Sequence, residues 1–160
     1  MSMPRGLIFV IGPSSVGKSH LCAKAAAELR LPHHDLDAEL GDPGLRTWSL
    51  VQGWLDAVTA PALVDVGAGT QHSCGEPLTA YLAERADRVI LVTDDPERAF
   101  ERNVVAGHRR LDDLDRYLEV EFRQRQALYG VAPHVVDYKM VGLDDALTLF
   151  VTLVRALART

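Results

Sequence analysis

One eight-residue segment constrains the fold of this chain more than any other feature. Residues 12–19 fit the pattern Gly-x-x-x-x-Gly-Lys-Ser at every fixed position. An apolar run, residues 6–11, precedes the segment, and the alanine-rich stretch 19–29 that follows has high helix propensity. A glycine-rich turn between a buried strand and a helix presents successive backbone N–H groups, and the helix start adds a positive partial charge. The segment therefore predicts a binding site for the phosphates of a nucleotide.

The two polar side chains at the end of this loop have separate expected roles. Lys18 is expected to reach the β- and γ-phosphates, and the Ser19 hydroxyl to bind Mg²⁺. The alternative is a plain glycine-rich turn with an exposed lysine, and the flanking strand and helix disfavour it. The pattern alone does not separate a kinase from a nucleotide hydrolase or a non-catalytic switch. Nucleotide contacts are expected from the whole loop: Gly12, Pro13, Ser14, Ser15, Val16, Gly17, Lys18 and Ser19.

Short apolar runs alternate with helical patterns along the rest of the chain. This alternation predicts βαβ units, a parallel sheet and a three-layer α/β domain, in which ligands bind beyond the carboxyl ends of the strands. The expected strands are residues 6–11, a short run ending at Asp35, 62–66, 88–93 and 134–137. The expected helices are residues 19–29, 47–59, 77–86, 96–106, 112–129 and 144–158.

Composition excludes several other classes of protein. A length of 160 residues suits one domain spanning residues 1–160, and a net charge of −5 argues against a broad nucleic-acid surface. The apolar run 6–11 is too short for a signal peptide or a membrane span. The two cysteines, Cys22 and Cys74, form neither a metal-binding pair nor a disulfide scaffold. We expect a cytoplasmic monomer whose partner is a small molecule, with no nucleic acid or membrane involved.

Several segments resemble the shikimate kinases, a family of small-molecule P-loop kinases. Residues 17–37 resemble that family's loop, first helix and Asp-x-Asp segment, and Gly67-Ala-Gly69 stands where the family has three glycines. Arg125-Gln-Ala-Leu-Tyr129 resembles its Arg-x-x-Leu-Tyr helix end, and residues 107–114 fall in the region of its lid. The resemblance implies the strand order 2-3-1-4-5, ATP and Mg²⁺ as cofactors, and transfer of the γ-phosphoryl group to an alcohol.

The chain departs from this family in the part that would hold the acceptor. The acceptor region, about residues 33–60, is short, and Arg46 is the only basic residue between Asp37 and Val66. Ala68 replaces the second glycine of the triplet, and the family's Arg-Pro-Leu-Leu is absent after Arg110. The resemblance is densest in the nucleotide half, so we do not expect shikimate itself to be the acceptor.

Three aspartates are candidates for the chemistry. Asp35 and Asp37 lie two apart, so both point to one face of an extended segment. The resemblance implies that Asp37 orients the acceptor hydroxyl and takes its proton, and that Asp35 holds Mg²⁺ through water. Alternatively, both only cap the next helix. Asp65 lies in an apolar strand, either as an acid directed at the water shell of Mg²⁺ or as a buried structural acid.

Three arginines are candidates for binding anions. Arg109 is expected to contact the nucleotide and Arg110 to swing over the phosphates, unless both are exposed lid charges. Arg125 is expected to hold a carboxylate of the acceptor, or else to pair with an acid on its own helix, Glu119 or Glu121. The resemblance also assigns acceptor contacts to Gly67, Ala68 and Gly69.

Two residue types receive structural interpretations. His33 and His34 are neighbours on an expected strand and therefore point oppositely, so a shared metal site is not expected. Cys22 is interpreted as a small buried apolar residue.

Together, the phosphate-loop pattern and the resemblance predict an ATP- and Mg²⁺-dependent kinase acting on an alcohol. The alternatives are a P-loop kinase of the gluconate, nucleoside or antibiotic type, or a non-catalytic nucleotide-binding regulatory module.

Overall fold

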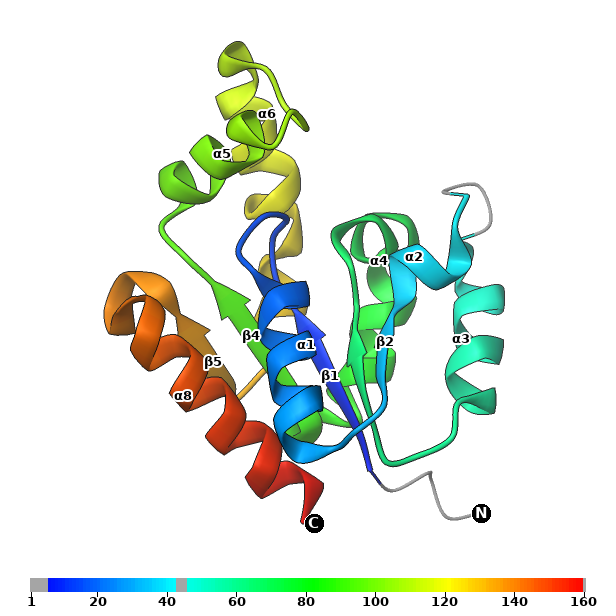
Figure 1. Ribbon diagram of the computed structural model, residues 1–160. Coiled ribbons are helices and arrows are strands. Elements are labelled where there is room, and N and C mark those ends of the chain that lie inside the picture. The colour runs from blue at the N-terminus through cyan, green and yellow to red at the C-terminus, as the bar shows by residue number, and fades with distance from the viewer. Residues whose placement is uncertain (1–5, 43–45, 160) are drawn as a thin grey trace.

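The computed structural model describes residues 6–42 and 46–159, and these form a three-layer α/β fold. Figure 1 shows a parallel sheet with helices on both faces. Its five strands run in the order β2-β3-β1-β4-β5, so both the fold class and the strand order 2-3-1-4-5 are confirmed. The strands are β1 Leu7–Ile11, β2 His33–Asp35, β3 Ala62–Asp65, β4 Val89–Thr93 and β5 His134–Asp137.

Helices connect the strands as the alternation predicts. The helices are α1 Lys18–Leu29, α2 Leu36–Leu40, α3 Trp48–Ala57, α4 Ala68–Ala83, α5 Pro96–Val105, α6 Leu114–Glu121, α7 Gln126–Tyr129 and α8 Tyr138–Ala158. Short 3₁₀ turns add η2 Ala86–Arg88, η3 Leu111–Asp113 and η4 Arg123–Arg125. None of the described helices combines the length and the apolar character needed to cross a membrane.

Successive residues of β1 point to the two faces of the sheet, as the pleat requires. Ile8 and Val10 pack with residues of α1 and α8 in one apolar core. Phe9 and Ile11 pack with residues of α3 and α4 in the other. Every residue of β1 is buried, which explains why the central strand is a continuous apolar run.

The helix expected at residues 77–86 begins nine residues earlier, at Ala68. Its first turn consists of small and polar residues without helical periodicity. The side chain of Asp37 accepts hydrogen bonds from the backbone N–H groups of this turn. A break at Gly75, with φ 50° and ψ −128°, separates this first part from the segment that contains Pro77. The prediction was wrong because the bonds that satisfy the helix start come from a distant residue.

The single helix expected at residues 112–129 is also interrupted. Phe122 has φ −122° and ψ −62°, and η4 follows it before α7 begins. At the break, the Tyr129 hydroxyl donates a 2.7 Å hydrogen bond to the Glu121 carbonyl, so a side chain satisfies this helix-end carbonyl. The last helix begins at Tyr138 rather than at residue 144, and Gly142, with φ 76°, introduces a kink that periodicity does not reveal.

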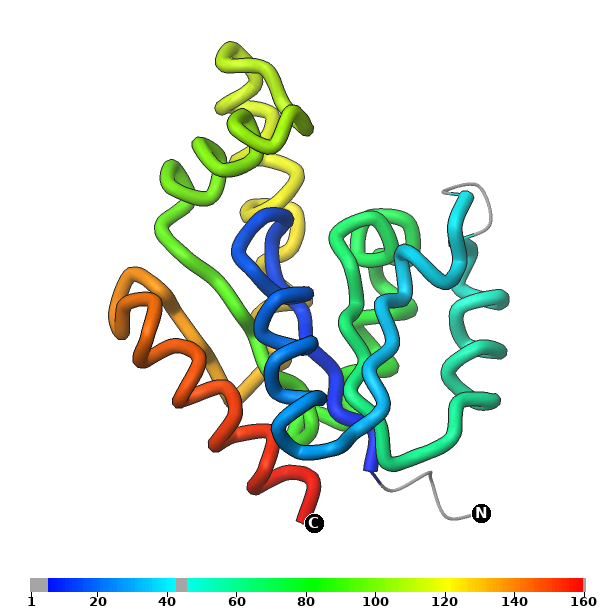
Figure 2. Tube along the Cα trace, in the orientation of Figure 1, coloured from blue at the N-terminus to red at the C-terminus, as the bar shows by residue number. Residues whose placement is uncertain are grey.

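The carboxyl ends of the strands face a protruding part of the molecule. Helices α5 and α6 extend beyond the sheet at this end, above the loop that joins β1 to α1 (Figure 1). The tube in Figure 2 traces this loop close to the segment that contains α6. The segment that is expected to bind phosphate therefore lies where α/β sheets bind their ligands.

Candidate functional site

The loop between β1 and α1 has the backbone conformation of a phosphate-binding turn. Gly12 requires the absence of a side chain, because a Cβ there would lie 1.9 Å from the Val92 carbonyl oxygen. Ser15 and Gly17 have φ values of 61° and 87°, in the left-handed region. Alternation of right- and left-handed backbone turns successive N–H groups toward one point, which is the geometry of an anion nest.

Lys18 lies inside this loop rather than in solvent. Its side chain is buried, and Nζ donates a 2.6 Å hydrogen bond to the Pro13 carbonyl. Burial lowers the pKa of Lys18, and the negative charges of Asp65 and Glu121 oppose that effect. Lys18 is thus held at the mouth of the loop, where the negative charge of a bound phosphate would further favour its ammonium form.

Ser19 and Asp65 meet directly at the end of the loop. The Ser19 hydroxyl donates a 2.8 Å hydrogen bond to Asp65 Oδ2, while Oδ1 is buried and has no hydrogen-bond partner among the described residues. Burial raises the pKa of Asp65, and the charge of Lys18 opposes this rise. A hydroxyl and a carboxylate at the phosphate end of a loop are oxygen donors of the kind that Mg²⁺ prefers. The two residues therefore fit a bound magnesium ion.

Asp35 lies near this pair but has a different partner. It is opposite Asp65 in the sheet register, and its Oδ1 accepts a 3.2 Å hydrogen bond from the Ala38 N–H. Asp35 thus caps α2, as the alternative interpretation of the sequence had it. Among the described acids, Asp65 is the one that contacts Ser19.

A buried glutamate that the sequence analysis considered only as an ion-pair partner occupies the other side of the loop. Glu121, at the end of α6, is 4 % exposed. Its Oε2 accepts a 3.2 Å hydrogen bond from the Ser14 N–H, and its Oε1 accepts a 3.0 Å bond from the Ser14 hydroxyl. The Glu121 carboxylate therefore accepts a hydrogen bond from a backbone N–H group of the loop that is predicted to bind phosphate.

Two arginines neutralise this carboxylate. Arg125 Nη1 donates to Glu121 Oε2 at 2.7 Å, and Arg109 Nη2 lies 3.7 Å from Glu121 Oε1. Arg125 is itself buried, its Nη2 donates to the Ala68 carbonyl, and its Nε has no hydrogen-bond partner among the described residues. The ion pair with Glu121, one of the two interpretations of Arg125, is present, although the break at Phe122 places the two residues in α6 and η4.

The two adjacent lid arginines occupy different environments. The Arg109 side chain is 19 % exposed, and its guanidinium lies over the Tyr117 ring at 5.5 Å. The Arg110 side chain is 84 % exposed and lies 3.6 Å from Asp112. In this conformation Arg109 faces the phosphate loop and Arg110 faces solvent.

Asp37 holds the turn between β3 and α4. Its Oδ2 accepts a 3.0 Å bond from the Gly69 N–H, and its Oδ1 accepts bonds from the N–H and hydroxyl of Thr70 at 2.9 and 2.6 Å. Both glycines of this turn are needed for these contacts. A Cβ on Gly67 would lie 2.3 Å from the Asp37 carboxyl, and one on Gly69 would lie 2.0 Å from Arg46 Nη1. Arg46 also belongs to this turn, since its Nε lies 4.0 Å from Asp37 Oδ1.

Gln71 is a further residue that the sequence analysis missed. Its side chain is buried, and Nε2 donates to the Gly12 carbonyl at 2.9 Å and to the Val66 carbonyl at 2.6 Å. The start of α4 is thereby tied to the start of the phosphate loop. A glutamine on a helix gives no local signal of such a bond, because both carbonyls belong to other segments.

A cavity of about 460 Å³ lies beside the glycine turn and the lid. Three arginines and two histidines line it, together with two acids, so its charge is mainly positive. The charged and titratable lining residues are His72, His108, Arg109, Asp113, Arg116, Glu121 and Arg125. Of the expected acceptor residues, Ala68, Gly69 and Arg125 line this cavity. Gly67 and Asp37 are not among its lining residues, and Asp37 is hydrogen-bonded to Gly69, which is.

Two other cavities differ in their relation to the loop. One of about 710 Å³ lies at the opposite end of the sheet, among Pro32, Trp54 and Pro61, away from the phosphate loop. A smaller one, of about 260 Å³, lies between Arg102 and Tyr138. Arg102 Nη1 donates to the Ser15 carbonyl at 3.4 Å, so the smaller cavity adjoins the loop. Residues 43–45 of the expected acceptor region lie outside the described residues.

Comparison with known proteins places this geometry in a structural group. No family model matches the sequence, and no curated protein matches it. Shikimate kinase from Bacteroides thetaiotaomicron superposes with a TM-score of 0.67 at 19 % identity, covering 97 % of this chain and 99 % of the other. A gluconokinase from Sinorhizobium meliloti gives 0.62 at 20 % identity, covering 99 % and 96 %. The YorR protein from Bacillus subtilis, in complex with phosphorylated GDP, gives 0.64 at 19 % identity, covering 96 % and 98 %.

At these identities the likeness concerns the fold. It extends over nearly the whole length of each chain. The resemblance noted in the sequence is therefore confirmed at the level of the fold: the chain has the shikimate kinase-like P-loop fold.

Proposed function

We propose that this chain is an ATP- and Mg²⁺-dependent kinase that transfers the γ-phosphoryl group to a hydroxyl of a small anionic molecule. The observation that carries the proposal is that the phosphate loop and the positively charged cavity adjoin each other. Glu121 contacts Ser14 of the loop and also lines the cavity. A triphosphate in the loop would thus have its terminal phosphate next to an acceptor in the cavity, as in-line transfer requires.

The parts of the site divide into a nucleotide side and an acceptor side. On the nucleotide side, the loop amides and Lys18 bind the phosphates, and the cavity between Arg102 and Tyr138 takes the base. Ser19 and Asp65 hold Mg²⁺, which supplies positive charge to the phosphate oxygens when it is bound. Arg109 neutralises charge on the phosphoryl group in the transition state.

On the acceptor side, buried guanidinium groups favour an anionic molecule. The Nε atoms of Arg46 and Arg125 are buried without hydrogen-bond partners among the described residues, and a carboxylate would satisfy such donors. Asp37 accepts three hydrogen bonds, and a carboxylate has about four acceptor positions, so one remains for the acceptor hydroxyl. This hydroxyl oxygen attacks the γ-phosphorus, the bond from that phosphorus to the β-phosphate oxygen breaks to release ADP, and the hydroxyl proton passes to the Asp37 carboxylate.

The test is acceptor-dependent release of ADP by the purified chain. Hydroxy acids and polyol acids are compared with neutral sugars and nucleosides of similar size, each in the presence of MgATP. The proposal expects turnover with at least one carboxylate-bearing alcohol and none with its amide or ester. Turnover on a neutral acceptor alone would overturn the anionic class. Tight binding of MgATP without ADP release for any acceptor would favour the non-catalytic regulatory module.

The two lid arginines give a matched pair of variants. Arg109→Ala should lower kcat on the order of 10²-fold with little change in the affinity for MgATP, because its charge acts on the moving phosphoryl group. Arg110→Ala should have a much smaller effect, because its side chain is exposed and directed at Asp112. Steady-state kinetics and calorimetry measure both quantities. A larger loss of kcat in Arg110→Ala than in Arg109→Ala would show that the lid closes to bring Arg110 to the phosphates.

A further inference from the structure

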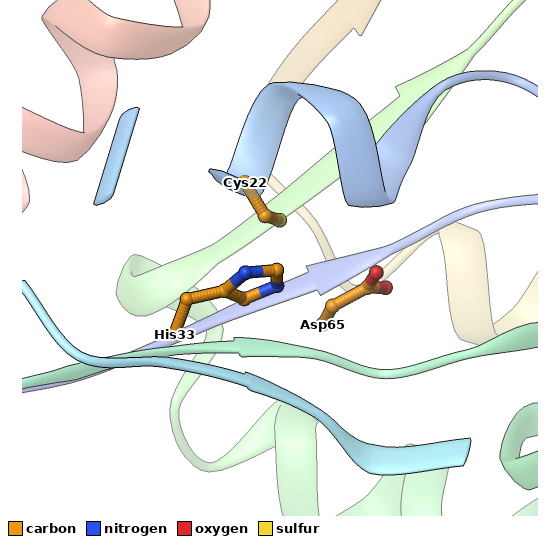
Figure 3. A group of neighbouring side chains, drawn as sticks. All are labelled: Cys22, His33 and Asp65. Carbon is orange, nitrogen blue, oxygen red and sulfur yellow. The ribbon is translucent and has the colours of Figure 1, made fainter. Parts of the chain in front are cut away.

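Three side chains from three elements converge behind the phosphate loop. Cys22 comes from α1, His33 from β2 and Asp65 from β3 (Figure 3). The cysteine sulfur, a ring nitrogen of His33 and a carboxylate oxygen of Asp65 all lie within 4.8 Å of one another. Figure 3 shows the imidazole ring beneath Cys22 and directed toward the carboxylate. His33 has only His34 beside it in the sequence as a possible co-ligand, whereas its spatial neighbours Cys22 and Asp65 come from other segments.

Two polar atoms of this cluster lack hydrogen-bond partners. His33 Nε2 and Asp65 Oδ1 are both buried and unpartnered among the described residues, although Asp65 Oδ2 is bonded to Ser19. Asp65 is 2 % exposed, and Cys22 is fully buried. Buried polar atoms almost always have a partner, so these orphaned atoms indicate a missing ligand.

The identity of the three donors selects the kind of ligand. A thiolate, an imidazole nitrogen and a carboxylate oxygen together suit a borderline divalent ion such as Zn²⁺, whereas Mg²⁺ prefers oxygen donors alone. We propose that Cys22, His33 and Asp65 form a binding site for Zn²⁺ that adjoins the magnesium site and shares the Asp65 carboxylate with it. The thiol proton is released to solvent when the Cys22 sulfur binds the ion, and a water molecule completes the tetrahedral set.

Metal binding at this site would affect the phosphate loop through the Asp65 carboxylate. The site connects α1, β2 and β3, and it shares the Asp65 carboxylate with Ser19. A bound ion would therefore fix the carboxylate that faces the loop, in the way that outer-shell groups orient metal ligands. The inference concerns metal binding and does not depend on whether the chain is a kinase.

Titration of the chain with Co²⁺ after removal of metal by a chelator tests the site without any measurement of activity. Co²⁺ takes the place of Zn²⁺ and reports a thiolate ligand by a sulfur-to-metal charge-transfer band in the near ultraviolet. We expect one equivalent to produce this band together with visible bands of a tetrahedral centre, and Zn²⁺ to bleach both. Absence of a spectral change in the wild-type chain would overturn the proposal and indicate a metal-free His33–Asp65 contact.

Matched variants assign the ligands. Cys22→Ser should abolish the charge-transfer band, whereas Cys74→Ser, which alters the other buried cysteine, should leave it intact. His33→Asn should weaken Co²⁺ binding by more than the roughly 10- to 100-fold that loss of an outer-shell partner costs, and His34→Asn should not. Circular dichroism checks that each variant is folded. A band that survives Cys22→Ser but is lost in Cys74→Ser would also overturn the assignment.

Discussion

Replacement of Lys18 by alanine is expected to weaken the binding of MgATP by roughly 30- to 5000-fold and to reduce any kinase activity to background. This range corresponds to the loss of about 2–5 kcal/mol that follows when one partner of a buried charge pair is truncated. The ammonium is buried at the mouth of the loop, with its nearest acceptor the Pro13 carbonyl at 2.6 Å. The triphosphate would replace that weak partner by charged oxygens. Calorimetry with MgATP, or with a non-hydrolysable analogue, measures the effect.

Lys24→Ala is the matched control for this variant. Lys24 lies on the same helix, α1, but its side chain is exposed, so its removal should leave nucleotide binding unchanged. Thermal unfolding of both variants without nucleotide checks that the fold is intact. Equal nucleotide affinity in Lys18→Ala and the wild-type chain would show that the loop does not bind phosphate in the expected way, and the proposed function would fall with it.

Glu121→Gln is expected to have opposite effects on stability and on nucleotide binding. Without nucleotide, the variant leaves the buried guanidinium of Arg125 without its counter-ion at 2.7 Å, so the free energy of unfolding should fall by about 3 kcal/mol or more. With MgATP, the affinity should rise on the order of tenfold, because a negative charge no longer competes with the phosphates for the Ser14 N–H. Denaturant unfolding with and without MgATP measures both effects.

The control for this variant lies on the same helix with the same spacing. Glu119 pairs with Arg123 at 3.1 Å, four residues away, but both side chains are about half exposed, at 47 % and 60 %. Glu119→Gln should change stability by about 0.5 kcal/mol or less and leave nucleotide affinity unaltered. Weaker binding of MgATP by Glu121→Gln would contradict this prediction and show that Glu121 contributes favourably to nucleotide binding.

The local patterns of the chain predicted its elements but not their ends. The continuous apolar run of β1 identifies it as a central strand, because both faces of a central parallel strand are buried. The first turn of α4 and the break at Phe122 had no such signal, since each depends on a side chain from another segment. Asp37 caps α4 across more than thirty positions, and the Tyr129 hydroxyl takes the carbonyl at the end of α6.

The candidate site shows the same division. Residues 12–19 carry a local signal because the loop, the lysine and the serine that are expected to act together are adjacent in the chain. Glu121 is 107 positions from Ser14, and nothing around it in the sequence indicates that it reaches the loop. Arg109 and Arg110 are equivalent in sequence, and only the packing of the lid against Tyr117 distinguishes them.

The sequence by itself determined the layered α/β fold and the place of the phosphate loop, because hydrophobic period and turn chemistry act between near neighbours. Only the tertiary structure decided which charges meet. It paired Glu121 with the loop, Arg46 with the glycine turn, and Cys22 with His33 and Asp65. Such contacts join segments that are distant along the chain, and the sheet order and helix packing, rather than any local pattern, bring them together.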